Sequence, residues 1–306
     1  MKSSAFTVLI AAAIAVPSLC EGIEFPRSPD ASLRIEAPQI RESSGICASK
    51  KRDGLFWTHN DSGSGPVIYG IRSDGSLVAT YRIRGAGSFD WEDIAVDQEG
   101  FIYIADVGNN RRDRRNLAVY KVKEPDDLTE EGVLQVTEKI AVEYPDGNYN
   151  CEALFIAENG DPVLITKDPG KPRVYGCEDG KWVFRQELET KGVVTGADMS
   201  TDGRLAVSTY VGFAIFERQD NGKWSGGNHT FAALGQCEAG CWNNGYLILT
   251  NEERGLFRFV IDRKNTAASL RKPPPNMVPI PPHIPASPVI EAMNIERFSR
   301  GAIFSM

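Results

Sequence analysis

Acidic and amide side chains recur at two kinds of position in this 306-residue sequence. The first kind lies near the start of short apolar segments such as WEDIAVD and CEALFIA, and comprises Glu42, Glu92, Asp93, Glu152, Asp198, Glu238 and Glu291. The second kind follows the next apolar segment and comprises Asn60, Asp61, Asp106, Asn109, Asn110, Asp168, Asn251 and Glu252. Converging carboxylates raise one another's pKa, and a bound cation relieves that repulsion.

Oxygen ligands without sulfur select a hard cation, Ca²⁺ before Mg²⁺ or Mn²⁺. We therefore predict a Ca²⁺ site with the ligands Glu42, Glu92, Glu152, Asp198 and Glu238. The alternative for each single residue is a local role, because Asp and Asn side chains commonly bond backbone amides in turns.

A run of arginines interrupts the acidic pattern. The segment NNRRDRRN begins at Asn109 and places Arg111, Arg112 and Arg114 beside the predicted acidic ring. Guanidinium groups bind phosphate or carboxylate in a bidentate manner. We predict that these arginines, with Asn60 and Asn109, contact a ligand; the alternative is a charged surface loop held by weak salt bridges.

If the site hydrolyses its ligand, the cation polarises the scissile group and a carboxylate takes the proton from water. Asp61 and Asp106 are the predicted catalytic residues, since each follows an apolar segment and lies in a loop within reach of solvent. The arginines would then orient an anionic leaving group.

A repeated unit positions these residues. Similar segments start at Ser43, Trp91, Cys151, Gly196 and Cys237, and each is followed by a Gly-containing turn and two further apolar segments. A period of roughly 40 to 50 residues with four short strands is typical of a β-propeller, in which four-stranded sheets surround a channel. A β-sandwich of many hairpins is the alternative.

The C-terminal region contains the start of a sixth repeated unit, because IEAMNI at Ile290 parallels CEALFI and GAIFSM parallels the second strand of a unit. We predict one all-β domain over residues 33–306, a six-bladed propeller with four-stranded antiparallel blades. The last blade is incomplete or is closed by the N-terminal strand SLRIEAP near Leu33. The Pro-rich residues 271–288 are predicted to form an extended surface excursion, or else a disordered linker before a chance match.

The N-terminal residues carry an export signal. Lys2 precedes an apolar core over residues 6–16, and small residues near position 20 offer a cleavage site, so residues 1–22 are predicted to be a signal peptide. A lipid anchor at Cys20 is the alternative. No later segment is long and apolar enough to span a membrane. We expect an exported, periplasmic or secreted, monomer.

Composition limits the partners and the chemistry. The formal net charge of −7 argues against nucleic-acid binding, so we expect a small-molecule or protein ligand on the channel face. Three histidines are too few for most zinc sites and leave little for a catalytic triad. Export permits disulfides, and Cys151–Cys177 or Cys237–Cys241 are candidate pairs.

The motifs ESSGI, WTHNDSG, DWEDIAVD, GFIYIADVGNN and VYKVKEP resemble those of exported bacterial propeller proteins, mainly over residues 42–125. More distantly, the sequence is similar to six-bladed propellers of the SMP-30/gluconolactonase, NHL-like and phytase-like esterase kinds. This resemblance implies a calcium-bearing channel mouth and hydrolysis of a lactone, ester or phosphoester. The chain departs from the pattern at Asn109, where the resemblance expects an acid, and it lacks a dense Lys/Arg lining.

Three functions follow from these patterns: a Ca²⁺-dependent hydrolase, a non-catalytic propeller that binds a ligand or protein on its rim, and a structural exported domain. An exposed aromatic patch would favour the second function. Trp57, Trp91 and Trp242 are its candidates, although tryptophan within a blade is usually core.

Overall fold

The structure is a computed structural model that describes residues 26–261, and every regular element in that range is a β-strand. The all-β prediction is confirmed. In chain order the strands are β1 (Ala31–Arg34), β2 (Ser43–Ala48), β3 (Leu55–Asn60), β4 (Val67–Arg72), β5 (Leu77–Arg84), β6 (Trp91–Val96), β7 (Phe101–Asp106), β8 (Ala118–Lys123), β9 (Glu131–Ala141), β10 (Cys151–Ile156), β11 (Pro162–Thr166), β12 (Arg173–Glu178), β13 (Lys181–Glu187), β14 (Val194–Met199), β15 (Leu205–Thr209), β16 (Gly212–Arg218), β17 (Trp224–Phe231), β18 (Cys237–Asn243), β19 (Tyr246–Asn251) and β20 (Gly255–Val260).

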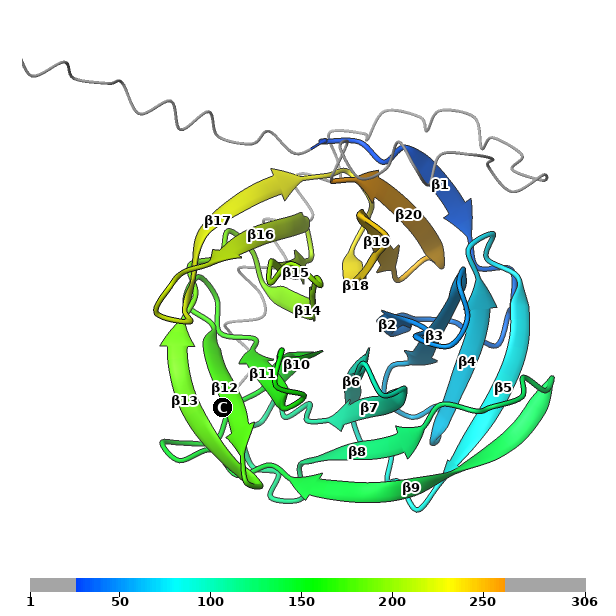
Figure 1. The fold of residues 1–306 in the computed structure, drawn as a ribbon, viewed down its shortest axis with the longest axis horizontal. Helices are drawn as coiled ribbons and strands as arrows, with labels where there is room; N and C mark the ends of the chain where they lie inside the picture. The colour runs from blue at the N-terminus through cyan, green and yellow to red at the C-terminus, as the bar shows by residue number, and fades with distance from the viewer. Residues whose placement is uncertain (1–25, 262–306) are drawn as a thin grey trace, which may run out of the picture.

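The strands form four-stranded antiparallel units arranged around a central axis (Figure 1). We call them blade 1 (β2–β5), blade 2 (β6–β9), blade 3 (β10–β13), blade 4 (β14–β17) and blade 5 (β18–β20 with β1). The first strand of each blade is innermost, and the chain moves outward through the blade before it enters the next. This arrangement is that of a β-propeller, as the repeat predicted.

The N-terminal strand closes the ring. β1 pairs antiparallel with β20, with Ala31 opposite Arg258 and Arg34 opposite Gly255, and so becomes the outer strand of blade 5. The SLRIEAP segment therefore supplies an outer strand, as predicted, but not the outer strand of a sixth blade. The blade that it closes is the one that starts at Cys237, because β1 occupies the outer edge of β20.

The six-blade prediction does not fit the described residues. Their inner strands β2, β6, β10, β14 and β18 follow one another around the axis, and β18 lies against β2. Five blades therefore complete the circle within residues 26–261, and no gap separates blade 5 from blade 1. The residues of the predicted sixth blade, 290–306, and the Pro-rich residues 271–288 lie outside the described residues, as does the predicted signal peptide.

Blades 1 and 2 are joined into one eight-stranded sheet. The first half of the 11-residue strand β9 pairs in parallel with β5, from Thr80 opposite Glu131 to Arg84 opposite Gln135. The second half of β9 pairs antiparallel with β8, its own blade partner. Among the described strands this is the one parallel pairing, and it fixes the angle between the two blades by backbone hydrogen bonds.

Apolar side chains fill the space between neighbouring blades. Blades 1 and 2 enclose Trp57, Trp91 and Ile104, while blades 2 and 3 enclose Tyr103 and Tyr175. Similar clusters lie at the three remaining junctions. Each sheet thus buries both faces against its neighbours, which explains why no unit is expected to be stable alone.

Two further expectations concern the interior. Trp57, Trp91 and Trp242 are buried, with 7% or less of their surface exposed, so they do not form the surface aromatic patch considered from the sequence. The five cysteines of the described range are buried and unpaired, so the predicted pairs Cys151–Cys177 and Cys237–Cys241 are wrong. Cys237 and Cys241 lie on the same strand, β18.

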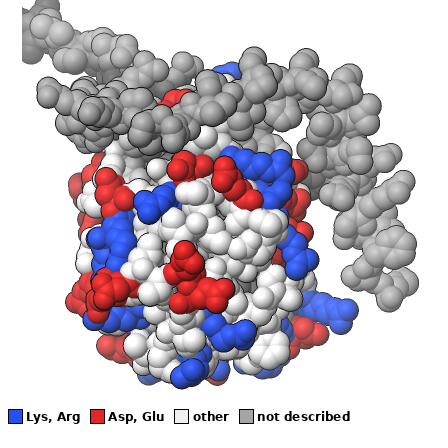
Figure 2. Space-filling view, turned by 90° about the vertical axis from the view of Figure 1, so that its right-hand side faces the viewer, with Lys and Arg blue, Asp and Glu red and all other residues white. Residues whose placement is uncertain are grey.

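The outside of the molecule carries both signs of charge. On the side shown in Figure 2, basic and acidic side chains are interspersed among uncharged ones, with no extended area of either sign on the described residues of that side. Within residues 26–261 there is also no helix that could cross a membrane.

Removal of β1 is expected to weaken the ring, because it exposes the edge of β20 and removes the backbone pairs that complete blade 5. A chain that starts at residue 35 should melt at least about 4 °C below one that starts at residue 26, which corresponds to a loss of roughly 1–2 kcal/mol of stability. Thermal unfolding followed by circular dichroism measures this difference. Equal melting temperatures would show that β1 does not close the ring in solution.

Candidate functional site at the channel mouth

Each inner strand begins with a β-bulge, and this irregularity builds the channel mouth. The register of all five inner strands of the described range shifts by one residue near the start, which leaves one extra residue unpaired with the second strand. The extra residues are Ser44, Glu92, Glu152, Thr195 and Glu238. We call this set the bulge ring.

A second set of residues surrounds the bulge ring. The residue that directly follows each second strand bonds its backbone to the segment before the inner strand, as in Lys167 N to Asn150 O at 2.9 Å. Blade 2 varies this pattern, because there Gly108 N makes the bond, to Asp90 O. The set, which we call the outer ring, comprises Asp61, Val107, Lys167, Tyr210 and Glu252.

Glu92 and Glu152 form a buried carboxyl pair at the mouth, each with 5% of its surface exposed. Burial and the negative charge of Glu152 raise the pKa of Glu92 well above its ordinary value, and the two side chains are hydrogen-bonded. Burial also raises the pKa of Glu152, but the ammonium group of Lys167 opposes this rise from 2.8 Å. Burial and the charge of Glu152 therefore favour the protonated form of Glu92, and Lys167 favours the ionised form of Glu152.

Lys167 supplies the positive charge of the mouth. Its Nζ lies 2.8 Å from Glu152 and 5.3 Å from the ring centre of Tyr210, whose hydroxyl group also bonds it. Burial lowers the pKa of Lys167, but Glu152 and Tyr210 raise it by more, so the ammonium form is retained. The sequence analysis assigned no role to Lys167 or Tyr210.

A small pocket lies at the mouth between blades 1 and 5, lined by Glu42, Ser44, Asp61, Glu238 and Glu252, with a volume of about 20 Å³. That volume is enough for one water-sized particle. Burial raises the pKa of Glu238 to about 8, although the Gln236 side chain donates to it at 2.7 Å and opposes the rise. At neutral pH Glu238 is therefore mostly protonated.

Gly108 lets two carboxyl groups approach the blade 2 loop. A Cβ atom at this position would collide with Glu92 Oε1 and with Asp90 Oδ2. Burial raises the pKa of Asp90, and Asp61 adds to the rise while Arg114 opposes it. The glycine of the Asp-x-Gly sequence after β7 is therefore required, because Glu92 and Asp90 pack closely over the Gly108 backbone.

The residues that end the second strands hold the mouth together. Asn60 Oδ1 accepts hydrogen bonds from the backbone of Arg41 and Glu42, and its Nδ2 donates to Gln39 O at 2.9 Å. Fully buried Asp106 accepts from the backbone of Phe89 and Asp90. These bonds are the local role that the sequence analysis considered as the alternative to ligand contact.

The loop after β7 is held by its own polar residues. Arg114 donates to Asp106 Oδ1 at 2.8 Å and to Gly108 O at 2.5 Å, and Arg112 pairs with Asp168 at 2.8 Å. Buried Asn109 donates its backbone N–H to Asn150 Oδ1 at 2.5 Å. Of the predicted ligand-binding residues, Arg111 is exposed, and Arg112, Arg114 and Asn109 are engaged in contacts within the protein.

The predicted metal ligands do not all converge. Glu92, Glu152 and Glu238 belong to the bulge ring, and Glu42 lines the adjacent small pocket. Asp198 lies three residues beyond the bulge residue Thr195, and its carboxylate accepts from the backbone of Met199 and Trp242. Burial raises the pKa of Asp198 to about 6.

These observations test the fit of a cation. Within residues 26–261 no three Asp, Glu, His or Cys side chains are grouped closely enough to hold a metal ion. The charge that a cation would supply at Glu152 comes from Lys167. The described geometry therefore does not fit the predicted five-residue Ca²⁺ site, and Ca²⁺ binding stays a prediction from sequence.

No protein-family model matches the chain, and no curated protein resembles it in sequence. The solved structures to which the chain is similar include three enzymes. The glutaminyl cyclase of Myxococcus xanthus is 11% identical over 76% of this chain and 94% of its own, with a TM-score of 0.49. The gluconolactonase of Xanthomonas campestris is 14% identical over 77% and 97%, with a TM-score of 0.42. Virginiamycin B lyase of Staphylococcus aureus is 14% identical over 77% and 75%, with a TM-score of 0.41. All are β-propeller types, so the likeness concerns the fold alone.

The raised pKa of Glu238 predicts a pH-dependent stability. The folded protein holds the Glu238 proton up to about pH 8, whereas an unfolded glutamate loses it near its ordinary value of 4.5. This contribution is complete at low pH and is lost as the pH rises from 4.5 to 8. The melting temperature of Glu238→Gln, relative to wild type, should therefore rise between pH 4 and pH 8, by at least about 2–4 °C.

Glu253→Gln is the matched control, because Glu253 is an exposed neighbour of the outer ring. Its melting temperature should follow that of the wild type at every pH. A difference between Glu238→Gln and wild type that does not change with pH would contradict the buried, protonated state of Glu238.

Proposed function

We propose that the channel mouth is an acid–base site that hydrolyses a neutral ester or lactone. The observation that carries this proposal is the buried pair of Glu92 and Glu152, in which Lys167 stabilises the ionised form of one glutamate and burial keeps the other protonated. Two carboxyl groups whose environments separate their pKa values are typical of acid–base catalysis.

In the proposed reaction a water molecule in the small pocket attacks the carbonyl carbon of the substrate. Asp61, which lines that pocket and is partly exposed, takes a proton from the water. Glu92 gives its proton to the departing alcohol oxygen as the bond between that oxygen and the carbonyl carbon breaks. Solvent then returns the proton from Asp61 to Glu92, which balances the cycle.

The charges of the mouth favour a neutral substrate. The negative charges of Asp90 and Asp61 act on Glu92, that of Glu252 acts on Glu238, and Lys167 is already bound to Glu152. Two of the three arginines predicted to bind a ligand, Arg114 and Arg112, are paired with Asp106 and Asp168. A phosphoester, one of the substrates considered from sequence, would meet repulsion from these carboxylates.

Asp106 is a poor candidate for the base in this proposal. Its side chain has no exposed surface, and its oxygens accept from two backbone N–H groups and from Arg114. Asp106→Asn is expected to disturb the blade 2 loop and the fold more than the chemistry, whereas Asp61→Asn is expected to remove the base.

The test is hydrolysis of 4-nitrophenyl butyrate and dihydrocoumarin, a neutral ester and a neutral lactone. Glu92→Gln should lower kcat by about 100-fold or more, the usual contribution of a positioned acid. In the wild type kcat/KM should fall as the pH rises through the elevated pKa of Glu92, and this descending limb should be absent in the Gln variant. Asp113→Asn, an exposed change in the neighbouring loop, should leave both parameters unchanged.

Absence of hydrolysis above background in the wild type would overturn the proposal and place a non-catalytic binding module first. That second candidate is favoured by Phe89, which precedes Asp90 at the mouth with 64% of its surface exposed. An exposed aromatic ring beside polar groups is suited to contact with a ligand.

In the proposed reaction the ammonium group of Lys167, and not a metal ion, balances the charge of Glu152. Hydrolysis should therefore continue in excess EDTA. Ca²⁺, predicted from the sequence, should raise the melting temperature as ln(1 + [Ca²⁺]/Kd) if the mouth binds it. Activity that requires Ca²⁺ would contradict the role of Lys167 and restore the cation hypothesis. Glu42→Gln, which changes the small pocket but not the Glu92–Glu152 pair, would then weaken the thermal response.

A further inference from the structure

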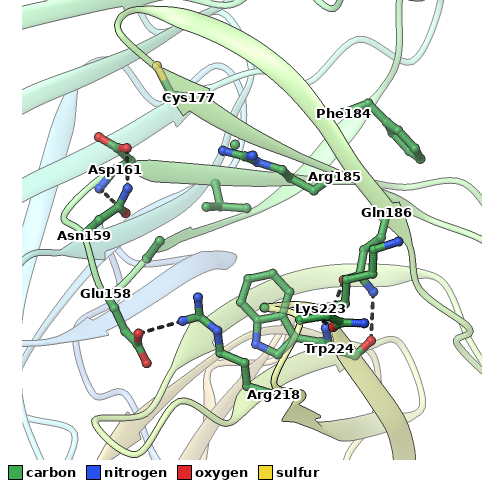
Figure 3. A pocket seen from close by; sticks show the side chains of 15 residues that line it. Glu158, Asn159, Asp161, Cys177, Phe184, Arg185, Gln186, Arg218, Lys223 and Trp224 are labelled. Carbon is green, nitrogen blue, oxygen red and sulfur yellow. Dashed lines mark hydrogen bonds and ion pairs between the residues drawn. The ribbon is translucent and has the colours of Figure 1, made fainter.

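A second pocket, with a volume of about 500 Å³, lies between blades 3 and 4 (Figure 3). Its walls come from the β10–β11 turn, the ends of β12 and β16, the second half of β13 and the start of β17. The channel mouth lies at the opposite ends of these strands, where β10 and β14 begin. The pocket is therefore separate from the site described above, and its volume is in the usual range for small-molecule sites.

An internal repeat shows how this junction differs from its neighbour. The sequence Gly-Lys-Trp opens the outer strand of blade 3 at Trp182 and the outer strand of blade 4 at Trp224. Trp182 Nε1 donates to Ala141 O of blade 2 at 2.8 Å. Trp224 Nε1, at the corresponding place, is buried and has no acceptor among the described residues.

Blades 3 and 4 are bridged by a side chain. Gln186 accepts the backbone N–H of Trp224 at 2.9 Å and donates to its carbonyl oxygen at 2.8 Å. These two hydrogen bonds join the outer strands β13 and β17 at the wall of the pocket. Burial of an unpaired N–H is unfavourable. A ligand acceptor beside Trp224 would give its indole N–H the kind of hydrogen bond that Trp182 already makes.

The pocket lining is basic on balance. Arg185, Arg218 and Lys223 line it, against the acids Glu158 and Asp161. Figure 3 shows the Arg185 and Arg218 side chains on opposite sides of the Trp224 indole, with Arg218 directed at Glu158, 2.8 Å away. The Arg218 and Glu158 side chains are 35% and 59% exposed, and an ion pair of this exposure exchanges readily for a ligand anion.

The same pocket offers apolar surface. The ring of Trp224 forms part of its wall, and Phe184 is 41% exposed at its edge. The guanidinium carbon of Arg218 lies 5.7 Å from the centre of the indole ring, so one cation and one aromatic surface are presented side by side. A flat apolar group and an anionic group can therefore be bound by neighbouring residues.

We propose that the pocket between blades 3 and 4 binds a small organic carboxylate with a flat apolar body. The carboxylate takes the place of Glu158 on Arg218 and accepts the Trp224 Nε1 hydrogen bond, and the apolar body packs against Trp224 and Phe184. This site is independent of the proposed hydrolysis.

The test is a titration of ¹⁵N-labelled protein with 2-naphthoate, followed by the indole Nε1–H resonances in nuclear magnetic resonance. The Trp224 resonance, identified by its absence in Trp224→Phe, should move downfield and saturate, and the Trp182 resonance should stay in place. Arg218→Gln should weaken binding by about tenfold or more, as expected for loss of a charged bidentate partner. Glu158→Gln should leave binding unchanged or tighten it.

Two controls keep the proposal falsifiable. 2-Naphthalenemethanol, the neutral analogue, should leave the Trp224 resonance in place, and Trp182→Phe should bind naphthoate as the wild type does. Absence of a saturable shift of Trp224, equal shifts with the neutral analogue, or wild-type affinity in Arg218→Gln would each overturn the proposal.

Discussion

The carboxylate of Asp93 ties three blades together at the axis of the ring. It accepts hydrogen bonds from Ile94 on its own strand, from Leu154 on β10 and from Ala197 on β14, and Asp198 makes a similar bond to Trp242 on β18. These bonds require the inner strands to approach closely, and a Cβ atom at Gly45 on β2 would lie only 2.9 Å from Ile94 N on β6. Burial nevertheless raises the pKa of Asp93, because the three N–H groups only partly offset the loss of water. Each inner strand of the described range also has a bulge near its start, and the bulge residues form the channel mouth.

The mouth concentrates negative charge because the bulge residues and the outer ring meet there. Three of the bulge residues are glutamates, and Lys167 is bound to one of them. Burial raises the pKa of the remaining two, Glu92 and Glu238, and so favours their protonated forms. Stability and reactivity therefore have the same origin in this region, since both depend on carboxyl groups that are held where water cannot solvate them.

Much of the architecture could be predicted from the sequence, but the number of blades could not. The recurrence of segments such as WEDIAVD and CEALFIA correctly indicates the inner strands, and SLRIEAP correctly indicates a closing strand. The six-blade count does not fit the described residues, because the number of blades depends on the angle between sheets, which a sequence pattern does not specify. The acids at Glu92, Glu152 and Glu238 were found by their recurrence. Lys167 and Tyr210 were missed because they share a position with Asp61 but not a residue type, so only alignment on the strand ends could have found them. The local roles of Asn60 and Asp106 depend on hydrogen bonds to distant backbone, which a sequence pattern does not specify.

The parallel pairing of β5 with β9 has a consequence for how the ring comes apart. Most junctions between blades consist of side-chain packing, which water can enter once the sheets separate by a small distance. The junction of blades 1 and 2 also contains a ladder of backbone hydrogen bonds from Thr80 to Arg84, and all of these must break together. Partial opening of the ring should therefore begin at one of the other junctions, and blades 1 and 2 should unfold as one cooperative unit. The five blades of the described range therefore form four units that separate independently, and one of these units contains both blade 1 and blade 2.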